Sequence, residues 1–177
     1  MLLLDIIVAV DSENGIGKKG ELPWHLSGDM KHFRDLTTAV ESKGKKNAVI
    51  MGRKTWDSLP PPYKPLPHRL NIVLTRGGLS LPDGVFQAAS LNEALGLIND
   101  RFQNVVEKVF VIGGGEIFKE ALTHPQCHKI YLTQILSKFD CATFFPSFSH
   151  LFQNLHKSPH QQEGSLEYYF AEYVRKK

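Results

Sequence analysis

The segment KVFVIGGGEIF, residues 108–118, decides which class of fold this sequence predicts. Its first half is almost wholly apolar, which is typical of a strand buried in a sheet. Three glycines follow at positions 113–115, and Ile117 and Phe118 then begin the apolar side of a helix. A strand that turns directly into a helix is the repeating unit of an α/β fold. The glycines either make this turn tight or let a pyrophosphate approach the backbone, although Phe118 replaces the third glycine of the Rossmann fingerprint.

Two further predicted strands, residues 47–51 and 68–74, also end in residues that suit a phosphate. These residues combine glycine, hydroxyl and cationic side chains: Gly52, Arg53, Lys54, Thr55, Thr75 and Arg76. Free backbone N–H groups at the start of a helix bind anions, and arginine adds charge and paired hydrogen bonds. Because ligands of α/β sheets bind outside the carboxyl ends of the strands, the two arginines indicate a cofactor with an extra phosphate.

The beginning of the chain predicts a central strand and then a long loop. Residues 3–10 are a nearly continuous apolar run, as in a strand that is covered on both faces. Residues 11–21 have no hydrophobic periodicity and contain three glycines. A loop of this length in a small domain usually forms a lid or a binding loop. Ile16, an apolar residue between two of the glycines, either contacts a ligand or anchors the loop by packing.

The next segment, residues 22–33, places one carboxylate among apolar neighbours. Ser27 is a suitable N-cap for a helix. Helical spacing then predicts one stripe along the buried face, made of Leu26, Met30, Phe33, Thr37 and Val40. Asp29 lies at the edge of that stripe, so its carboxylate must be paired, hydrogen-bonded or protonated. The alternative interpretation is that Asp29 only complements the positive end of the helix.

The last third of the chain predicts strands without a long helix between the final two. Residues 129–136, a segment around 155–158 and residues 167–174 have strand patterns, with loops at 140–146 and 159–165. These strands should be antiparallel and close the sheet.

Together the segments predict an α/β fold that forms a single domain over residues 1–177. We expect a mostly parallel central sheet of about eight strands with antiparallel C-terminal strands, flanked by about four helices. One helix begins at the capping box Ser90-Leu91-Asn92-Glu93. The proline-rich segment 59–67 should run along the surface, since prolines remove backbone donors.

Composition limits the classes of partner. The 177 residues carry a net charge of +3 and have a pI near 8.8, which favours anionic ligands such as phosphates and carboxylates. The basic runs 43–46 and 175–177 are short and lack interleaved aromatic residues, so they favour solvated turns over a nucleic-acid surface. No stretch approaches the roughly 20 apolar residues of a membrane helix.

Cysteine usage favours a reducing compartment. Cys127 and Cys141 are the two cysteines, and they have neither metal-binding nor redox spacing. We expect reduced thiols in a soluble, cytoplasmic protein, with a disulfide between them as the alternative.

Several motifs follow one another along essentially the whole chain. They are Ile16-Gly17-Lys18, Leu22-Pro23-Trp24 with Asp29, Gly52-Arg53-Lys54-Thr55-Trp56, Pro65-Leu66-Pro67-His68-Arg69, Ile112-Gly113-Gly114-Gly115 and Thr143-Phe144-Phe145-Pro146. In order and spacing they closely resemble the motifs of dihydrofolate reductases. The resemblance implies reduction of 7,8-dihydrofolate by NADPH, with hydride transfer to pterin C6 and protonation of N5.

The resemblance also implies which residues meet the substrate. Asp29 matches the family's acid, whose ionised carboxylate can accept paired hydrogen bonds from the pterin, while the route of the proton to N5 stays open. Thr133 matches the hydroxyl that supports this acid. Leu22 and Trp24 match residues that border the pocket, with core packing as the alternative. Arg69 matches the arginine that pairs with the α-carboxylate of the substrate's glutamate. The implied walls are Val8, Ala9, Met30, Phe33, Ser58, Leu59, Leu66 and Ile112.

By the same resemblance, NADPH contacts gather at the strand ends, and no metal is implied. The implied contacts are Ala9, Ile16, Gly17, Gly52, Arg53, Lys54, Thr55, Leu74, Thr75, Arg76, Gly113, Gly114, Gly115, Glu116, Ile117 and Phe118. Those that match contacts to the adenosine phosphate would select NADPH over NADH. In the family the Gly113-Gly114 peptide bond is cis.

Three positions depart from the family pattern. The acid is Asp29 where vertebrate members carry Glu, which implies a non-vertebrate source. Phe118 stands where many members have Tyr, so a hydroxyl near the nicotinamide is missing. Ala142 stands where an acid is usual, and in some bacterial members that acid holds the lid closed.

Other functions remain open from the sequence alone. A pyrimidine reductase of related fold, as in riboflavin synthesis, would keep the cofactor sites but not Leu22-Pro23-Trp24 with Asp29. A basic RNA-binding module would use residues 43–46 and bind with strong salt dependence. An inactive relative would bind folate without turnover. We expect a monomer that binds dihydrofolate and antifolate inhibitors, either as a separate chain or as part of a fusion with thymidylate synthase.

Overall fold

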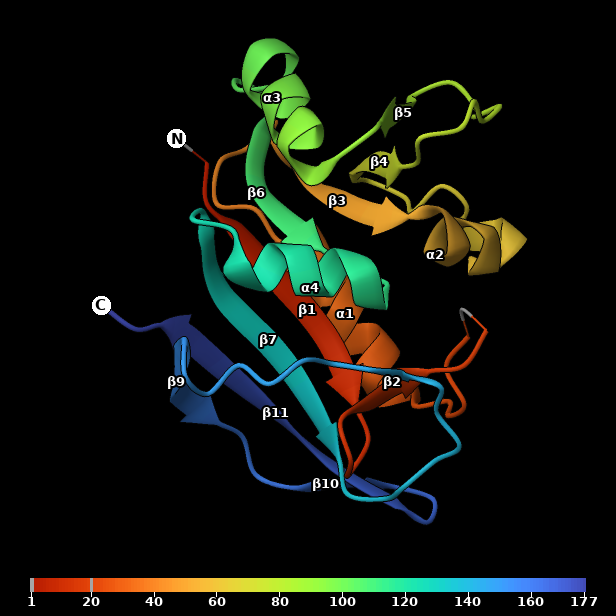
Figure 1. The fold of residues 1–177 in the computed structure, drawn as a ribbon, viewed down its shortest axis with the longest axis vertical. Helices are drawn as coiled ribbons and strands as arrows, with labels where there is room; N and C mark the ends of the chain where they lie inside the picture. The colour runs from red at the N-terminus through yellow and green to blue at the C-terminus, as the bar shows by residue number, and fades with distance from the viewer. Residues whose placement is uncertain (1, 20) are drawn as a thin grey trace.

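Nine strands of the part of the chain that the structure describes, residues 2–19 and 21–177, form one sheet in the computed structural model (Figure 1). In chain order they are β1 (Leu4–Val10), β3 (Lys46–Gly52), β4 (Leu70–Leu74), β5 (Val85–Ala88), β6 (Val106–Val111), β7 (Cys127–Ile135), β9 (Phe152–Lys157), β10 (Gln161–Glu163) and β11 (Leu166–Arg175). Across the sheet they follow the order β10-β11-β7-β1-β6-β3-β4-β5, and β9 pairs with β11 beside this path.

The strand directions confirm the expected α/β fold. Strands β1, β3, β4, β5, β6 and β7 pair in parallel with one another. Strand β11 is antiparallel to β7, β9 and β10. Because the parallel strands share one direction, the carboxyl ends of β1, β3, β4 and β6 lie along one edge of the sheet, where ligands of such folds bind.

Helices cover both faces of the sheet. They are α1 (Ser27–Thr38), α2 (Arg53–Ser58), α3 (Leu91–Arg101) and α4 (Gly115–Thr123), and a short 3-10 turn η1 spans Pro61–Tyr63. Side chains of α3 and α4 pack into the larger core cluster, whereas those of α1 and α2 pack into a second cluster on the opposite face. Figure 1 shows α4 in front of the sheet and α1 behind it.

Local signals explain the start of α3 and the state of the thiols. The Ser90 hydroxyl accepts a hydrogen bond from the Glu93 N–H at 3.0 Å, and the Glu93 carboxylate accepts one from the Ala89 N–H at 3.1 Å. The predicted capping box is therefore confirmed. Cys127 is buried, Cys141 is half-buried and both are free thiols, as the spacing of the cysteines predicted.

Three short strands lie where the sequence predicted only loops. Strand β2 (Gly15–Gly17) lies within the expected 11–21 loop and pairs with β8 (Thr143–Phe144), which lies within the expected 140–146 loop. Gly20 of the former loop lies outside the described residues. Strand β10 lies within the expected 159–165 loop. These strands are too short to show periodicity, and their existence depends on partners far away in the sequence.

Helix α1 differs from its predicted form at both ends. Ser27 is the first helical residue, the N-cap is Leu26, and no side chain of the cap residue closes the helix. The predicted N-cap role of Ser27 is therefore wrong. Leu26 and Thr37 are buried as expected, but Met30 is 51% exposed and Val40, beyond the end of the helix, is 36% exposed. The buried stripe is therefore narrower than predicted, and Thr37 is the buried residue within α1 itself.

Candidate active site

Asp29 lies in the first turn of α1 and is hydrogen-bonded to the sheet. The Thr133 hydroxyl of β7 donates to its Oδ1 at 2.6 Å. Burial raises the pKa of Asp29, the Thr133 hydrogen bond lowers it, and the negative charge of Glu163 raises it, so that the pKa lies above its ordinary value. A carboxylate whose pKa is raised in this way is typical of a functional site and suits proton exchange.

The N-terminal N–H groups of α1 are bound by a different carboxylate. Glu163, at the end of β10, accepts hydrogen bonds from the Ser27 N–H at 2.8 Å and from the Gly28 N–H at 3.1 Å. The Asp29 carboxylate turns to Thr133 instead. Glu163 therefore complements the positive end of the helix, and Asp29 is left for another role.

Trp24 contributes a buried donor near this carboxylate. Its side chain is 7% exposed and packs in one cluster with Leu26, Ile135 and Tyr168, and the Phe139 ring lies 5.3 Å from its own. Among the described residues, Trp24 Nε1 is a buried side-chain nitrogen without a hydrogen-bond partner. Because an unpaired buried donor costs free energy, this N–H is available to a polar ligand or water.

Apolar side chains on the α1 face form a wall beside Asp29. Four of the implied substrate contacts belong to one cluster there: Phe33, Leu59, Leu66 and Ile112. Leu22 and Met30 are 56% and 51% exposed, so their apolar side chains are accessible to a ligand. Ser58, at the end of α2, is exposed as well. Exposed apolar groups that rim a carboxylate suit a flat, partly apolar ligand.

Val8 and Ala9 project to opposite faces, because successive residues of a strand alternate. The Val8 side chain packs with the core under α3 and α4, so it does not join the wall that contains Phe33. Ala9 lies on the other face beside the Trp24 cluster and is paired in register with Thr133. The structure thus brings Ala9, but not the side chain of Val8, to the side of the acid.

Arg69 is a buried cation on the same face. Its side chain is 8% exposed, Nε donates to the Pro67 carbonyl at 2.8 Å, and Nη1 donates to Thr37 Oγ1 at 2.9 Å. Burial lowers the pKa of Arg69, and the nearby charge of Arg34 lowers it further. Two neighbouring cations create an excess of positive charge, which favours an anionic group such as a carboxylate.

Two side chains hold the segment around Arg69 in position: Asn71, which sequence reasoning missed, and Thr37, which it placed in the buried stripe without a polar role. Asn71 accepts from the Leu66 N–H at 2.9 Å and donates to the Leu66 and Arg69 carbonyls at 3.0 and 2.9 Å. Thr37 is fully buried and donates to the Phe33 carbonyl at 2.7 Å while it accepts from Arg69. Both are polar residues within apolar patterns, which was the signal available in the sequence.

The glycine-rich ends of β3 and β6 meet at the sheet edge. The Gly52 N–H donates to the Gly113 carbonyl at 2.8 Å. A Cβ atom on Gly113 or Gly114 would lie 3.5 or 3.7 Å from Thr55 Oγ1, and one on Gly52 would lie 3.3 Å from Ile117. Residues implied to contact the cofactor from two distant parts of the sequence therefore lie side by side.

The start of α4 also meets the 11–21 segment. A Cβ atom on Gly115 would lie 2.5 Å from Thr143 Cγ2 and 3.8 Å from Ile16 Cδ1, so β2 and β8 pass close to the N-terminus of α4. Gly17 is buried and Glu116 is exposed. Phe118 and Leu74 behave differently from the other implied cofactor contacts, because they are 4% and 7% exposed and belong to the core.

Cationic and hydroxyl groups follow the adjacent ends of β3 and β4. Gly52 and Leu74 are paired in register. The residues that follow them, Arg53 and Thr75, therefore lie next to each other at the carboxyl ends of the two strands. Arg53, Lys54 and Arg76 are exposed. Arg53 Nε lies 3.7 Å from Asp57 Oδ2. Both side chains are exposed, so the guanidinium stays accessible to a ligand.

Asp11, which sequence reasoning did not single out, organises the 11–21 segment. This carboxylate is 1% exposed and accepts hydrogen bonds from the N–H groups of Glu13, Gly15 and Phe139 at 2.9, 2.7 and 3.0 Å. Burial acts to raise its pKa, but these backbone N–H groups and Cys141 outweigh it and lower the pKa. The segment is therefore tied to the 139–145 region.

Position 142, an alanine, connects to the 11–21 segment through its backbone. Ala142 uses its backbone N–H, which donates to the Gly17 carbonyl at 2.9 Å. The Asp140 carboxylate, two residues earlier, pairs with Lys18 Nζ at 2.7 Å. Both groups are exposed, so this ion pair is accessible to screening by salt.

Comparisons with known proteins agree with this geometry. The family described as dihydrofolate reductase matches residues 3–175. The dihydrofolate reductase of Heliothis virescens is 43% identical over 183 aligned residues, which cover 97% of each chain. This chain belongs to the dihydrofolate reductase family. The solved dihydrofolate reductase of Schistosoma mansoni is 38% identical and superimposes with a TM-score of 0.88. The superposition covers 99% of each chain.

Plant relatives in the dihydrofolate reductase family are longer. The bifunctional dihydrofolate reductase-thymidylate synthase of Glycine max is 44% identical over 175 residues, which cover 96% of this chain but 33% of that protein. The chain thus spans about a third of the length of the bifunctional relatives it matches. The similarity is confined to one part of those proteins.

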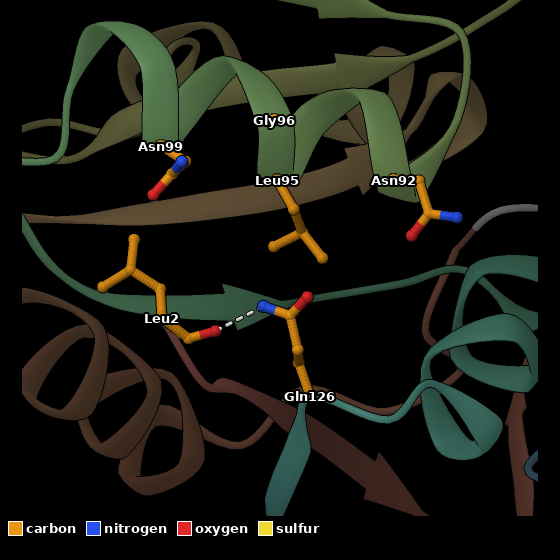
Figure 2. A pocket seen from close by; sticks show the side chains of 6 residues that line it. All are labelled: Leu2, Asn92, Leu95, Gly96, Asn99 and Gln126. Atoms are coloured by element: carbon orange, nitrogen blue, oxygen red, sulfur yellow. Dashed lines mark hydrogen bonds between the residues drawn. The ribbon is translucent and has the colours of Figure 1, made fainter.

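A cavity of about 440 Å³ lies away from the family's site, on the α3 side (Figure 2). It is lined by Leu2, Asn92, Leu95, Gly96, Asn99 and Gln126. Gln126 Nε2 donates to the Leu2 carbonyl at 2.6 Å on the side of the cavity that faces α3. None of the residues implied for substrate or cofactor lines it. In the described part of the chain, no helix has the length and apolar character needed to cross a membrane.

Proposed function

We propose that this chain reduces 7,8-dihydrofolate to 5,6,7,8-tetrahydrofolate with NADPH as the hydride donor. The observation that carries the proposal is the half-buried Asp29 carboxylate, which is hydrogen-bonded to Thr133 and has a raised pKa at the rim of an apolar wall. Family membership supports the same reaction. The reaction belongs to one-carbon and thymidylate metabolism.

Asp29 is proposed to bind and orient the pterin. Its Oδ2, which has no hydrogen-bond partner among the described residues, and its Oδ1, which already accepts from Thr133, can receive paired N–H donors from the pterin's amino group and ring nitrogen. Such pairing would fix which edge of the ring faces the hydride donor. Asp29, whose pKa is raised, would be the source of the proton for N5. The proton would pass through water or a pterin tautomer, because N5 lies on another edge of the ring.

The remaining substrate contacts are proposed from the arrangement of the α1 face. Arg69 would pair with the α-carboxylate of the substrate's glutamate, since its Nη2 has no hydrogen-bond partner among the described residues. Trp24 Nε1 would supply a donor to the pterin or to a water beside it. The apolar contacts would come from Ala9, Leu22, Met30, Phe33, Ser58, Leu59, Leu66 and Ile112, with Val8 contributing through its backbone.

The strand-end residues fit NADPH. Gly52 and the glycines at 113–115 lie where β3 and β6 end, and α4 begins there with the N-cap Gly114, which supplies no side-chain acceptor to the first N–H groups of the helix. Arg53, Lys54, Thr55, Thr75 and Arg76 would hold the adenosine phosphates. Further proposed contacts are Ala9, Ile16, Gly17, Leu74, Glu116, Ile117 and Phe118. When bound, NADPH supplies the hydride.

An assay of NADPH oxidation with dihydrofolate tests the proposal. Wild type should turn over, and Asp29→Asn should lose activity by about a hundredfold or more at neutral pH, while NADPH still binds in a fluorescence titration. A wild type without turnover, or a fully active Asp29→Asn, would overturn the assignment. A pyrimidine substrate for related reductases serves as a control and should not be reduced.

Other expectations remain predictions. Antifolates that mimic the pterin should compete with dihydrofolate for Asp29. A monomeric state, a cytoplasmic location and an association with thymidylate synthase are expectations from the sequence. Size-exclusion chromatography tests the first of these.

A further inference from the structure

The first turn of α1 is held from outside the helix. Glu163 is the last residue of β10, and its two carboxylate oxygens bind the Ser27 and Gly28 N–H groups at 2.8 and 3.1 Å. A free helix N-terminus leaves N–H donors without partners, and here the helix's own N-cap residue, Leu26, supplies no side-chain acceptor. The capping group therefore comes from a distant strand, 135 residues away from Gly28 in the sequence.

A tight hairpin turn places this carboxylate. Glu163 pairs in register with Leu166 of β11, and a two-residue loop joins them. Gly164 begins the loop with a φ of 62°, which glycine adopts without strain and which the first loop position of a type II′ turn requires. The backbone thus fixes the position from which the Glu163 side chain reaches α1.

The same hairpin contacts α1 at a second point. Tyr168 of β11 is 3% exposed, and a Cβ atom on Gly28 would lie 2.2 Å from its hydroxyl oxygen. Only glycine fits there, so the helix backbone packs directly against Tyr168. Phe170, two residues further along β11, is paired in register with Thr133, the partner of Asp29. One pair of strands therefore holds both the start of α1 and the hydroxyl that binds Asp29.

We propose that Glu163 is a positioning residue for Asp29, which pins the turn that carries Asp29 and supplies the negative charge that Asp29 faces. This proposal rests on the proposed function, in which Asp29 is the acid. Glu163 acts through the backbone of residues 27 and 28 and through its field. It is assigned no direct contact with the substrate.

The charges around Asp29 favour this role. The groups that face it are the Thr133 hydroxyl on β7, the Glu163 carboxylate on β10 and the Tyr168 phenol on β11. The Ser27 and Gly28 N–H groups lower the pKa of Glu163, as does His25, so these groups favour the ionised form of Glu163. The other charged groups of α1 include Lys31 and Asp35, which are exposed and pair with each other, with Lys31 Nζ 2.5 Å from Asp35 Oδ2.

Removal of the Glu163 charge should therefore ease the ionisation of Asp29. The carboxylate of Glu163 repels that of Asp29, and it also offsets the positive end of the helix. Without it, both effects favour ionised Asp29. The expected change is a fall of about half a pH unit in the titration midpoint of Asp29.

Carbon-13 NMR of aspartate-labelled protein measures this midpoint without substrate, with the Asp29 resonance assigned from Asp29→Asn. Glu163→Gln keeps one acceptor oxygen for the helix and removes the charge, so it should lower the midpoint. Glu163→Asp keeps the charge but moves it back from α1, because the side chain is shorter. It should change the Asp29 midpoint by less. The matched control is Glu167→Gln on β11, where the exposed Glu167 pairs with His160 at 2.9 Å and should leave the midpoint in place.

The outcomes separate this inference from the proposed function. An unchanged Asp29 midpoint in Glu163→Gln, or an equal change in Glu167→Gln, overturns the positioning role even if wild type reduces dihydrofolate. A lowered midpoint in a protein that shows no turnover supports the coupling and overturns the proposed function instead. In an active enzyme, the descending limb of the kcat/KM pH profile, which reports ionisations of the free enzyme, should move with the NMR midpoint, and a limb that stays fixed would contradict the role.

Discussion

The Thr133 hydroxyl donates to Asp29 Oδ1 at 2.6 Å, across 104 positions of sequence and from the middle of the sheet to the first turn of a helix. The bond favours the ionised carboxylate and so lowers the pKa of Asp29, against the larger effect of burial. Thr133 is 3% exposed, so little solvent competes for this bond. This hydrogen bond connects the sheet directly to the carboxylate that is proposed as the acid.

Replacement of Thr133 by Val should raise the midpoint at which Asp29 titrates. Val has nearly the same shape but cannot donate, and the loss of a hydrogen bond to a charged group should move the descending limb of the kcat pH profile upward by about one pH unit. This direction is opposite to that expected for Glu163→Gln. Thr133→Ser keeps the hydroxyl and should retain the wild-type profile; a Val profile equal to the Ser profile would contradict the prediction.

Asp29 should lower the stability of the folded chain at neutral pH. Because burial raises its pKa in the folded state above the ordinary value of 3.8, the folded state holds the proton more tightly than the unfolded state. The free energy of unfolding therefore falls as pH rises through this window and stays lower above it. Asp29→Asn should gain about 0.5–2 kcal/mol at neutral pH in urea titrations.

The pH dependence of the stability gained by Asp29→Asn serves as the control for this prediction. Below the ordinary pKa of Asp, both states of the wild type are protonated, and the difference between wild type and Asp29→Asn should shrink. An Asn variant that is less stable than wild type at neutral pH would show that the ionised carboxylate is needed for folding.

Replacement of Arg69 by Lys should weaken substrate binding more than turnover. Lys cannot keep both the bonds to Pro67 and Thr37 and a paired bond to a carboxylate. The KM for dihydrofolate should rise by about 10- to 100-fold with a smaller change in kcat. A dihydropterin without the glutamate tail is the control substrate, and its KM should be the same for both proteins.

Replacement of Arg76 or Arg53 by Ala should reduce the preference for NADPH over NADH. The exposed guanidiniums at the ends of β3 and β4 are proposed to bind the extra phosphate, so the KM for NADPH should rise by about tenfold while that for NADH stays constant. Arg101→Ala, on α3, is the matched control. Equal effects on both cofactors would place the phosphate elsewhere.

Gly113→Ala should destabilise the end of β6. Gly113 has a φ of 127°, a backbone conformation that side chains other than glycine rarely adopt, so the cost should be about 1–3 kcal/mol in urea titrations. Gly96 lies inside α3, where an added Cβ atom would meet nothing within 4 Å. Gly96→Ala should instead gain about 0.5–1 kcal/mol, and a neutral Gly113→Ala would contradict the strain argument.

Long regular elements and the strand ends could be predicted from local sequence. The apolar runs at 3–10, 47–51 and 108–112 correspond to β1, β3 and β6, because a strand buried on both faces requires continuous apolar residues. The parallel order then brings glycines and cations to one edge, as expected. The predicted N-cap at Ser27 was wrong, because local capping signals say nothing about an acceptor that arrives from another strand.

The sequence by itself determined the α/β class, the family and the residue types of the site, since these depend on periodicity and on motifs that each occupy a few neighbouring positions. Only the tertiary structure decided that Glu163 caps α1, that Asp11 ties down the 11–21 segment and that Val8 faces away from the wall of Phe33. Hydrogen bonds and packing between distant segments follow from three-dimensional distance, which strand order and register establish. The environment that raises the pKa of Asp29 is therefore a property of the assembled sheet.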